Sequence, residues 1–109
     1  MPIPFRTELQ PFLTEFADQH RGVRLGRMFG LPAVYVGRRL VTCLMEEGLI
    51  VRLPEDVARK ELRGGAKPYS RRARAAGTWV MYTPRTLAAA RRLTTVLEVA
   101  VRHAAEGIA

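Results

Sequence analysis

The feature that most restricts the fold is a succession of three short apolar segments, residues 33–36, 40–45 and 49–53, joined by connections of only a few residues. Their β-branched and aromatic content is typical of strands. Gly37 and Arg38 separate the first two segments, and a glycine at the first central position suits a type II′ hairpin turn. Parallel neighbours would need long crossover connections. We therefore predict an antiparallel meander.

A helix is predicted ahead of the meander. Four apolar residues recur there at the spacing of one helical face: Leu9, Phe12, Leu13 and Phe16. The start of this helix has two alternatives. Thr7 and Gln10 resemble a capping box. Pro11 instead favours a start at Gln10 with the proline in the first turn, because proline clashes with the carbonyl one turn back inside a helix. The helix is expected to end near residues 20–22.

A second helix and two strands are predicted after the meander. Residues 54–56 are proline followed by two acids, which favours a helix start, and the glycine pair 64–65 ends that helix. Residues 67–70 predict a strand that Pro68 confines to an edge or a strand start. Residues 78–82, with the sequence TWVMY, predict a further strand.

A last helix is predicted from residues 83–84 to about residue 107, with apolar residues along one stripe. The order of elements is then α-β-β-β-α-β-β-α. A chain of 109 residues suits one domain, and no repeat or linker divides it. We therefore predict an α+β fold of two layers, with a five-stranded antiparallel sheet and a single domain over residues 1–109.

The predicted strands are apolar on both faces. Leu40, Thr42 and Leu44 alternate with Val41, Cys43 and Met45. A sheet covered on one side alternates between apolar and polar residues instead. Either the helices divide between the two faces, or another subunit covers the second face. We favour a homodimer as the hypothesis for this chain.

Composition favours a cytoplasmic protein that does not enter the membrane. The sequence lacks a stretch of about 18 consecutive apolar residues, and its first ten residues lack the apolar region of a signal peptide. The single cysteine, Cys43, forms neither an internal disulfide nor a cysteine-based zinc site.

Side chains able to support catalysis or hold a metal are few. The candidate nucleophiles are Ser70 and Cys43, and the candidate bases are His20 and His103, but the sequence assembles no nucleophile, base and orienting group. Cys43 fits a small core residue, and the histidines fit helix ends. Asp18 and His20 stand too close in sequence to share a helix face. We expect no catalytic residue, no metal and no cofactor.

Positive charge is concentrated in one window of the sequence. The net charge is +8, yet residues 59–92 alone contain ten basic residues against the single acid Glu61. Such a window is typical either of a solvated face in an arginine-rich protein or of a surface for phosphates. Five residues are candidates for contact with an anion or a nucleic acid: Lys67, Arg71, Arg72, Arg74 and Arg85. Tyr69 and Trp79 flank the central arginines and are candidates for base stacking.

The order and spacing of several short motifs resemble the N-terminal domain family of TfoX, also called TfoX/Sxy-like. The match covers about residues 25–104, and seven residues carry it in a structural role: Met28, Phe29, Gly30, Gly37, Pro54, Tyr82 and Pro84. Leu31-Pro32 departs from the further glycine of many members. We expect Gly30 to allow a bend where the chain enters the sheet, with Met28 and Phe29 packed beside it.

The resemblance implies a two-layer α+β fold, a bacterial cytoplasmic setting and no established catalytic residues. The best-known relatives regulate bacterial competence and carry a second, C-terminal domain, so the specific competence role is not transferred. We predict a non-enzymatic regulatory or protein-interaction module. The alternative is an accessory protein that binds nucleic acid through residues 59–92, and an enzyme for small molecules is a third possibility if a deep pocket with titratable groups exists.

Overall fold

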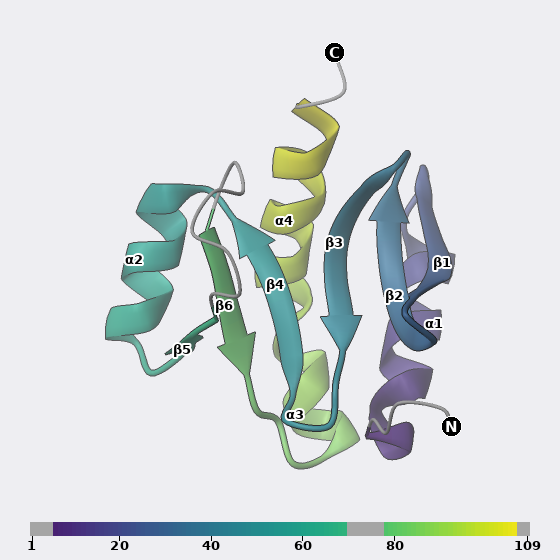
Figure 1. The fold of residues 1–109 in the computed structure, drawn as a ribbon, viewed down its shortest axis with the longest axis horizontal. Helices are drawn as coiled ribbons and strands as arrows, with labels where there is room; N and C mark the ends of the chain where they lie inside the picture. The colour runs from purple at the N-terminus through teal and green to yellow at the C-terminus, as the bar shows by residue number, and fades with distance from the viewer. Residues whose placement is uncertain (1–5, 70–77, 107–109) are drawn as a thin grey trace.

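The computed structural model describes residues 6–69 and 78–106, which form an α+β fold built on one antiparallel sheet (Figure 1). Six strands are present in these residues: β1 (Val23–Met28), β2 (Leu31–Val36), β3 (Arg39–Leu44), β4 (Leu49–Leu53), β5 (Lys67–Pro68) and β6 (Thr78–Tyr82). Their spatial order is β1-β2-β3-β4-β6-β5, and every neighbouring pair is antiparallel. The predicted meander is therefore confirmed within a larger sheet.

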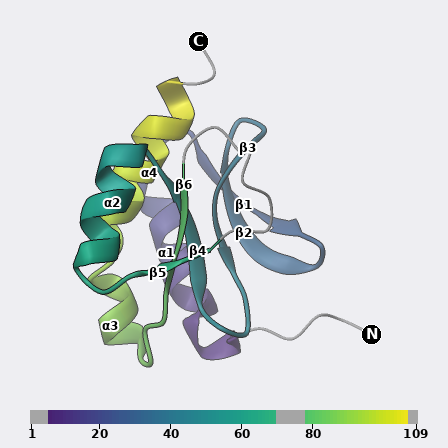
Figure 2. The same ribbon diagram turned by 60° about the vertical axis from the view of Figure 1, so that its left-hand side comes forward.

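The helices lie on one face of the sheet (Figures 1 and 2). They are α1 (Gln10–Gln19), α2 (Glu55–Arg63), α3 (Leu87–Arg91) and α4 (Thr94–Glu106), and a 3-10 turn, Thr7–Leu9, precedes α1. Helix α1 packs on β1 and β2, α4 on β3 and β4, and α2 on β6. The helices therefore cover a single face of the sheet. The alternative that helices divide between the two faces, one of the two explanations for strands that are apolar on both sides, is wrong.

The main core lies between the helices and the sheet. The four apolar residues of the first helical stripe, Leu9, Phe12, Leu13 and Phe16, are at most 2% exposed. They pack with residues of the strands and of the other helices, such as Val51 and Leu97, in one continuous cluster. Full burial of each such side chain contributes about 1.5–3 kcal/mol. This core fixes the sheet on the helices.

The sheet has one strand more than the sequence predicted. Strand β1 lies ahead of the meander, so that the step at Met28 and Gly30 does not open the first strand. Met28 ends β1 and pairs with Leu31, the first residue of β2. The sequence of β1, VRLGRM, is hard to recognise as a strand because it is an edge strand, largely exposed, and contains Gly26.

The last predicted helix is two helices. The side chain of Thr86 caps α3 by accepting a hydrogen bond from the Ala89 N–H at 3.1 Å. The chain then turns at Arg92 and Leu93 before α4 begins. The helix starts about three residues later than the predicted residues 83–84, because Thr86 supplies the cap. At the other end of the chain, α1 begins at Gln10 with the proline in its first turn, so the second alternative is confirmed.

A bulge in β3 changes which residues share a face. The register between β2 and β3 shifts after Val34. Val41 therefore joins Leu44 in the main core, while Leu40 joins Cys43 on the opposite face. An extra residue in one strand reverses the alternation from that point. The strict alternation assumed from the sequence is thus wrong at Val41.

A second apolar cluster covers the face of the sheet that is turned away from the helices. Its centre is buried, with relative exposure of 8% or less: Leu31, Ala33, Cys43, Ile50 and Met81. Partly buried side chains, among them Tyr35 and Trp79, pack against this centre. The two-sided apolar pattern is therefore accommodated within one chain. The homodimer stays a prediction. It was motivated by the apolar second face, and the centre of that face is already buried in the single chain.

Three further local predictions are confirmed, at Gly37, at Pro54 and at strand β5. Gly37 has φ 59° in the two-residue connection between Val36 and Arg39, as a type II′ turn requires. Pro54 directly precedes α2. Strand β5 is a two-residue edge strand.

In the described ranges, no helix combines the length and the apolar character that crossing a membrane requires.

Candidate functional site

The predicted anion-contact residues do not form one described cluster. Lys67 is exposed on the edge strand β5, and Arg85 is exposed in the connection from β6 to α3. The backbone carbonyl of Arg85 accepts a hydrogen bond from Arg6 Nη2 at 3.2 Å. Arg71, Arg72 and Arg74 lie outside the described residues.

Part of the charge in residues 59–92 is neutralised by acids from outside that window. Arg91 binds Glu15 of α1 through two hydrogen bonds, Nε to Oε2 at 3.1 Å and Nη2 to Oε1 at 2.7 Å. This contact lowers the pKa of the Glu15 carboxyl. Arg59 pairs with Glu55 one turn earlier in α2. The window is therefore less strongly positive in the fold than its sequence indicates.

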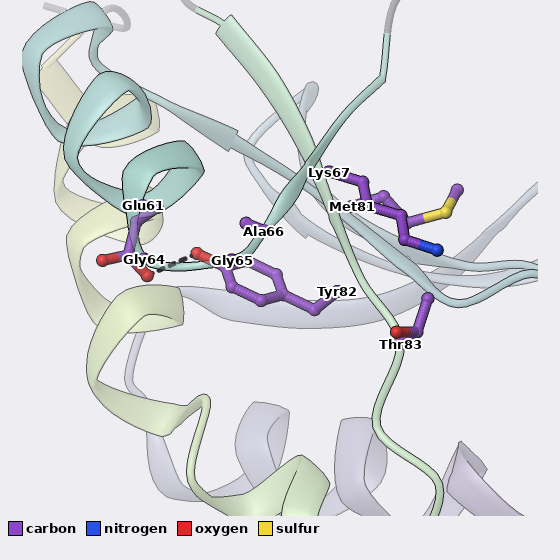
Figure 3. A pocket seen from close by; sticks show the side chains of 8 residues that line it. All are labelled: Glu61, Gly64, Gly65, Ala66, Lys67, Met81, Tyr82 and Thr83. Atoms are coloured by element: carbon purple, nitrogen blue, oxygen red, sulfur yellow. Dashed lines mark hydrogen bonds between the residues drawn. The ribbon is translucent and has the colours of Figure 1, made fainter.

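A cavity of about 240 Å³ lies beside the loop that joins α2 to β5 (Figure 3). The hydroxyl of Tyr82 donates to the Glu61 carboxylate at 2.6 Å across it, and Lys67 also lines the wall. Partial burial and the nearby carboxylate raise the pKa of the Tyr82 phenol. The hydrogen bond between Tyr82 and Glu61 joins β6 to α2.

This loop does not form a phosphate cradle. The N–H groups of Gly64, Gly65 and Ala66 all donate to carbonyl oxygens at the end of α2, at 3.0–3.3 Å. A phosphate loop instead directs its N–H groups towards the ligand. The sequence GGAK at residues 64–67 therefore forms the end of a helix.

Two of the candidate catalytic side chains, Cys43 and His20, are buried or hydrogen-bonded in the described part of the chain. Cys43 is fully buried, and burial raises the pKa of its thiol to about 11, so the nucleophilic thiolate is disfavoured. His20 uses both ring nitrogens, one at 2.8 Å from the Phe16 carbonyl and one at 2.9 Å from Glu98. His103 lies in the last turn of α4. Ser70 lies outside the described residues.

Metal-binding groups do not gather in residues 6–69 and 78–106. Within these residues no three side chains of histidine, cysteine, aspartate or glutamate come close enough to hold an ion. The described ranges therefore offer no cluster of metal ligands.

The turn between β1 and β2 carries the most unusual side chain of the described structure. Phe29 is 78% exposed and has φ 52°, a left-handed conformation that costs a bulky residue about 1–2 kcal/mol. Gly30 follows with φ 81°. Two positive φ values in a two-residue hairpin are typical of a type I′ turn, which favours asparagine and glycine. The expectation that Phe29 packs beside Gly30 is wrong.

The body of the same hairpin is held by an unusual contact. The ring of Tyr35 lies so close to Gly26 that a Cβ there would meet ring atoms at 3.1 and 3.2 Å. The Tyr35 hydroxyl thereby reaches the carbonyl of Arg27 at 3.0 Å. The guanidinium of Arg24 stacks on the same ring at 4.7 Å from its centre. Gly26 is thus required for close approach, which explains a glycine inside a strand.

We use the name β1 edge surface for six residues at this edge of the sheet: Arg21, Arg24, Leu25, Arg27, Phe29 and Arg38. Arg24 also donates to the Gly37 carbonyl at 3.1 Å, and Arg27 donates to the Gly30 carbonyl at 3.0 Å. These bonds hold the guanidinium groups in place without neutralising them. No carboxylate lies within 4.0 Å of the arginines of this surface in the described residues.

The β1 edge surface was not predicted from the sequence, although a signal was present. Residues 19–45 contain five arginines and no acidic residue. This run of positive charge is less dense than the one in residues 59–92, from which the candidate contact residues were chosen. The exposure of Phe29 had no sequence signal, because an apolar residue beside a glycine is equally compatible with a packed corner.

The residues of the predicted family motif fall into structural positions, with Phe29 as the exception. Gly30 and Gly37 form hairpin turns, and Pro54 precedes α2. Tyr82 binds Glu61. Pro84 is buried and its carbonyl accepts from Arg6 Nη1 at 3.2 Å. Met28 packs against the second apolar cluster.

Comparison of the chain with models of known protein families, with curated proteins and with solved structures found no match. The resemblance to the N-terminal domain of TfoX therefore rests on the motif residues.

Proposed function

We propose that this chain is a non-enzymatic interaction module that contacts its partner through the β1 edge surface. The observation that carries this proposal is Phe29, a large apolar side chain that is exposed on a backbone conformation unfavourable for it. Neither property contributes to folding. Strained residues and exposed aromatic residues are both enriched where proteins bind partners. A regulatory role of the kind that the TfoX resemblance implies is compatible with such a module.

The proposal is tested by partner capture with variants at one position. Wild-type protein, Phe29→Asn and Phe29→Tyr are tagged and used to capture proteins from a bacterial lysate with and without nuclease. We expect partners that resist nuclease to bind wild type and Phe29→Tyr, and to be reduced about tenfold or more by Phe29→Asn. Equal capture by all three proteins would contradict the proposal, because the tyrosine variant keeps the aromatic ring and the asparagine variant does not.

The second candidate is binding of nucleic acid. Arg24 and Arg27 favour it because both guanidinium groups are positioned and neither faces a carboxylate within 4.0 Å in the described structure. Phe29 is then available to stack on a base. The candidate from the sequence, residues 59–92, has Lys67 and Arg85 exposed on separate elements.

Salt titration distinguishes these two surfaces. Labelled duplex and single-stranded DNA are titrated at two salt concentrations with wild type, with Arg24→Gln/Arg27→Gln and with Lys67→Gln/Arg85→Gln. Each phosphate contact that is lost reduces the salt slope by about 0.9 for duplex DNA. The pair that flattens the slope identifies the surface. Absence of binding at about 50 mM salt would remove the nucleic-acid candidate.

A further inference from the structure

Within residues 6–69 and 78–106, the free edge of β1 differs from the other edge of the sheet (Figure 1). Strand β5, at the opposite edge, has two residues, one of which is Pro68, and such an edge resists pairing with another strand. Strand β1 has six residues and no proline. It therefore provides the longer template for an additional strand.

The register of the hairpin shows which backbone groups of β1 point outward. Met28 and Leu31 flank the two-residue turn and form a hydrogen-bonded pair. Counting back from Met28 towards the start of β1, every second residue then forms backbone hydrogen bonds with β2. The N–H and C=O groups of the residues between them, Leu25 and Arg27, are directed to the free edge. The hydroxyl of Tyr35 reaches the Arg27 carbonyl at 3.0 Å, as expected for a carbonyl outside the ladder.

The charge at this edge selects for an acidic partner. Arg24 is fixed by the Tyr35 ring and by the Gly37 carbonyl, which places it beside the turn that carries Arg38. Arg27 is fixed at the other end of the strand by the Gly30 carbonyl. Both positive charges are held along the edge before any partner binds. Carboxylates on an incoming strand would find these donors already in place.

Apolar contact is available at the same edge. Leu25 lies in the middle of β1 and is 41% exposed, and Phe29 at the turn is 78% exposed. These are the two large apolar side chains that stand out as exposed in the described residues. In peptide recognition by strand addition, main-chain hydrogen bonds provide the affinity and side-chain contacts provide the specificity.

We propose that β1 binds an extended acidic segment of another protein as an additional antiparallel or parallel strand. The backbone of that segment bonds to Leu25 and Arg27, its carboxylates meet Arg24 and Arg27, and an apolar side chain contacts Phe29. This inference rests on the proposed function and specifies its partner. It requires an extended main chain on the partner, which the proposed function alone does not require.

The backbone groups favour a peptide over a nucleic acid. At Leu25 the edge offers a backbone N–H donor and a carbonyl acceptor. The backbone of a peptide supplies the acceptor and the donor that these two groups require. Phosphate oxygens accept hydrogen bonds and do not donate them, so a phosphate cannot pair with the Leu25 carbonyl. A second copy of the chain is disfavoured because it would bring the same arginines of the β1 edge surface together.

The first test uses a labelled synthetic valine-rich peptide with two glutamates three residues apart, long enough to span β1, and measures its fluorescence anisotropy with the full chain. This spacing places the glutamates on opposite faces of the added strand, as it places Arg24 and Arg27 on opposite faces of β1. Two further peptides carry N-methyl groups on the odd-numbered or on the even-numbered residues. Strand addition uses the N–H groups of alternate residues, so one methylated peptide should bind about tenfold more weakly and the other about as well as the parent. Absence of binding by the parent peptide, or equal effects of the two methylations, would overturn the proposal.

Protein variants test the same contact from the other side. Arg24→Gln/Arg27→Gln should weaken the peptide about tenfold and reduce its salt dependence. Tyr35→Phe releases the Arg27 carbonyl and should strengthen binding about threefold, a gain that misfolding cannot produce. Weaker binding by Tyr35→Phe in a protein with an unchanged circular dichroism spectrum would contradict the proposed backbone contact.

The outcomes separate this inference from the proposed function. Partner capture that depends on Phe29, together with equal effects of the two methylated peptides, overturns strand addition and leaves the interaction surface in place. Partner capture that is independent of Phe29 overturns the proposed function itself. Tighter binding of single-stranded DNA than of the peptide, or a dimer in light scattering that the Arg24→Gln/Arg27→Gln variant dissociates, identifies another occupant of the edge and also overturns the inference.

Discussion

His20 at the end of α1 and Glu98 in α4 form a hydrogen-bonded pair, with 2.9 Å between Nε2 of the histidine and Oε2 of the carboxylate. The other ring nitrogen lies 2.8 Å from the Phe16 carbonyl, and the imidazole stacks on the Phe16 ring at 4.0 Å between centres. Both partners of the ring nitrogens are acceptors. Only the doubly protonated imidazolium can donate to both, so this contact favours the charged histidine.

The first prediction is that stability falls as pH rises through the pKa of His20. The hydrogen bond to Glu98 is the main cause that raises the pKa of His20 above its usual value of about 6.5. A raised folded pKa means that the contribution is complete below the unfolded pKa and is lost as pH passes the folded pKa. Thermal denaturation should therefore show a lower Tm at about pH 8 than at about pH 6.

The variants Glu98→Gln and His20→Gln are the controls for this prediction. Both remove the charged partner and should flatten the profile between these pH values. A wild-type Tm that is constant or rises over this range would contradict the ion pair.

The second prediction concerns Phe29. Asparagine is favoured at the first central position of a type I′ turn, whereas phenylalanine there is strained. Phe29→Asn should raise the free energy of unfolding by about 1 kcal/mol, measured by urea denaturation with an unchanged m value. Phe29→Ala keeps a side chain on the same backbone and should gain much less. A loss of stability in Phe29→Asn would show that the side chain supports the fold.

Much of this fold could be predicted from local sequence signals. The meander followed from three apolar segments and a glycine turn at Gly37, and the start of α2 followed from Pro54 and the acids after it. These features depend on residues close together in the chain. Strand β1 and the break before α4 depend on more distant packing. Gly26 in particular is explained by the ring of Tyr35 on the neighbouring strand, which no local pattern shows.

The candidate surface was harder to predict than the fold. Charge counts pointed to residues 59–92, but the pairing of Arg91 with Glu15 involves residues far apart in the sequence. The exposure of Phe29 depends on the sign of one φ angle. Sequence patterns treat an apolar residue as a core candidate, so the side chain most relevant to binding was assigned to packing.

The third prediction compares two glycines that both have positive φ. A Cβ at Gly48 (φ 156°) would lie 2.1 Å from the backbone oxygen of Tyr82, whereas a Cβ at Gly65 (φ 114°) would meet no atom within 4 Å. Gly65→Ala should therefore cost only the backbone strain, about 1 kcal/mol. Gly48→Ala must also displace β6 from the turn after β3, and should cost about 3 kcal/mol or more. Urea denaturation of both variants measures the difference, and equal losses would contradict the close contact.

The fourth prediction concerns the Tyr82 phenol, which burial and the Glu61 carboxylate keep protonated. Because its folded pKa is raised, Tyr82 contributes stability that is present below the unfolded pKa of about 10 and is lost as pH rises through the folded value. Ultraviolet titration should show a late component, from Tyr82, that ionises only when the protein unfolds in alkali. Tyr82→Phe should remove this late component and lower the free energy of unfolding by about 1 kcal/mol at neutral pH.

Tyr35→Phe is the matched control, because the Tyr35 hydroxyl donates to a carbonyl at an exposed edge. Persistence of the late component in Tyr82→Phe would contradict the assignment.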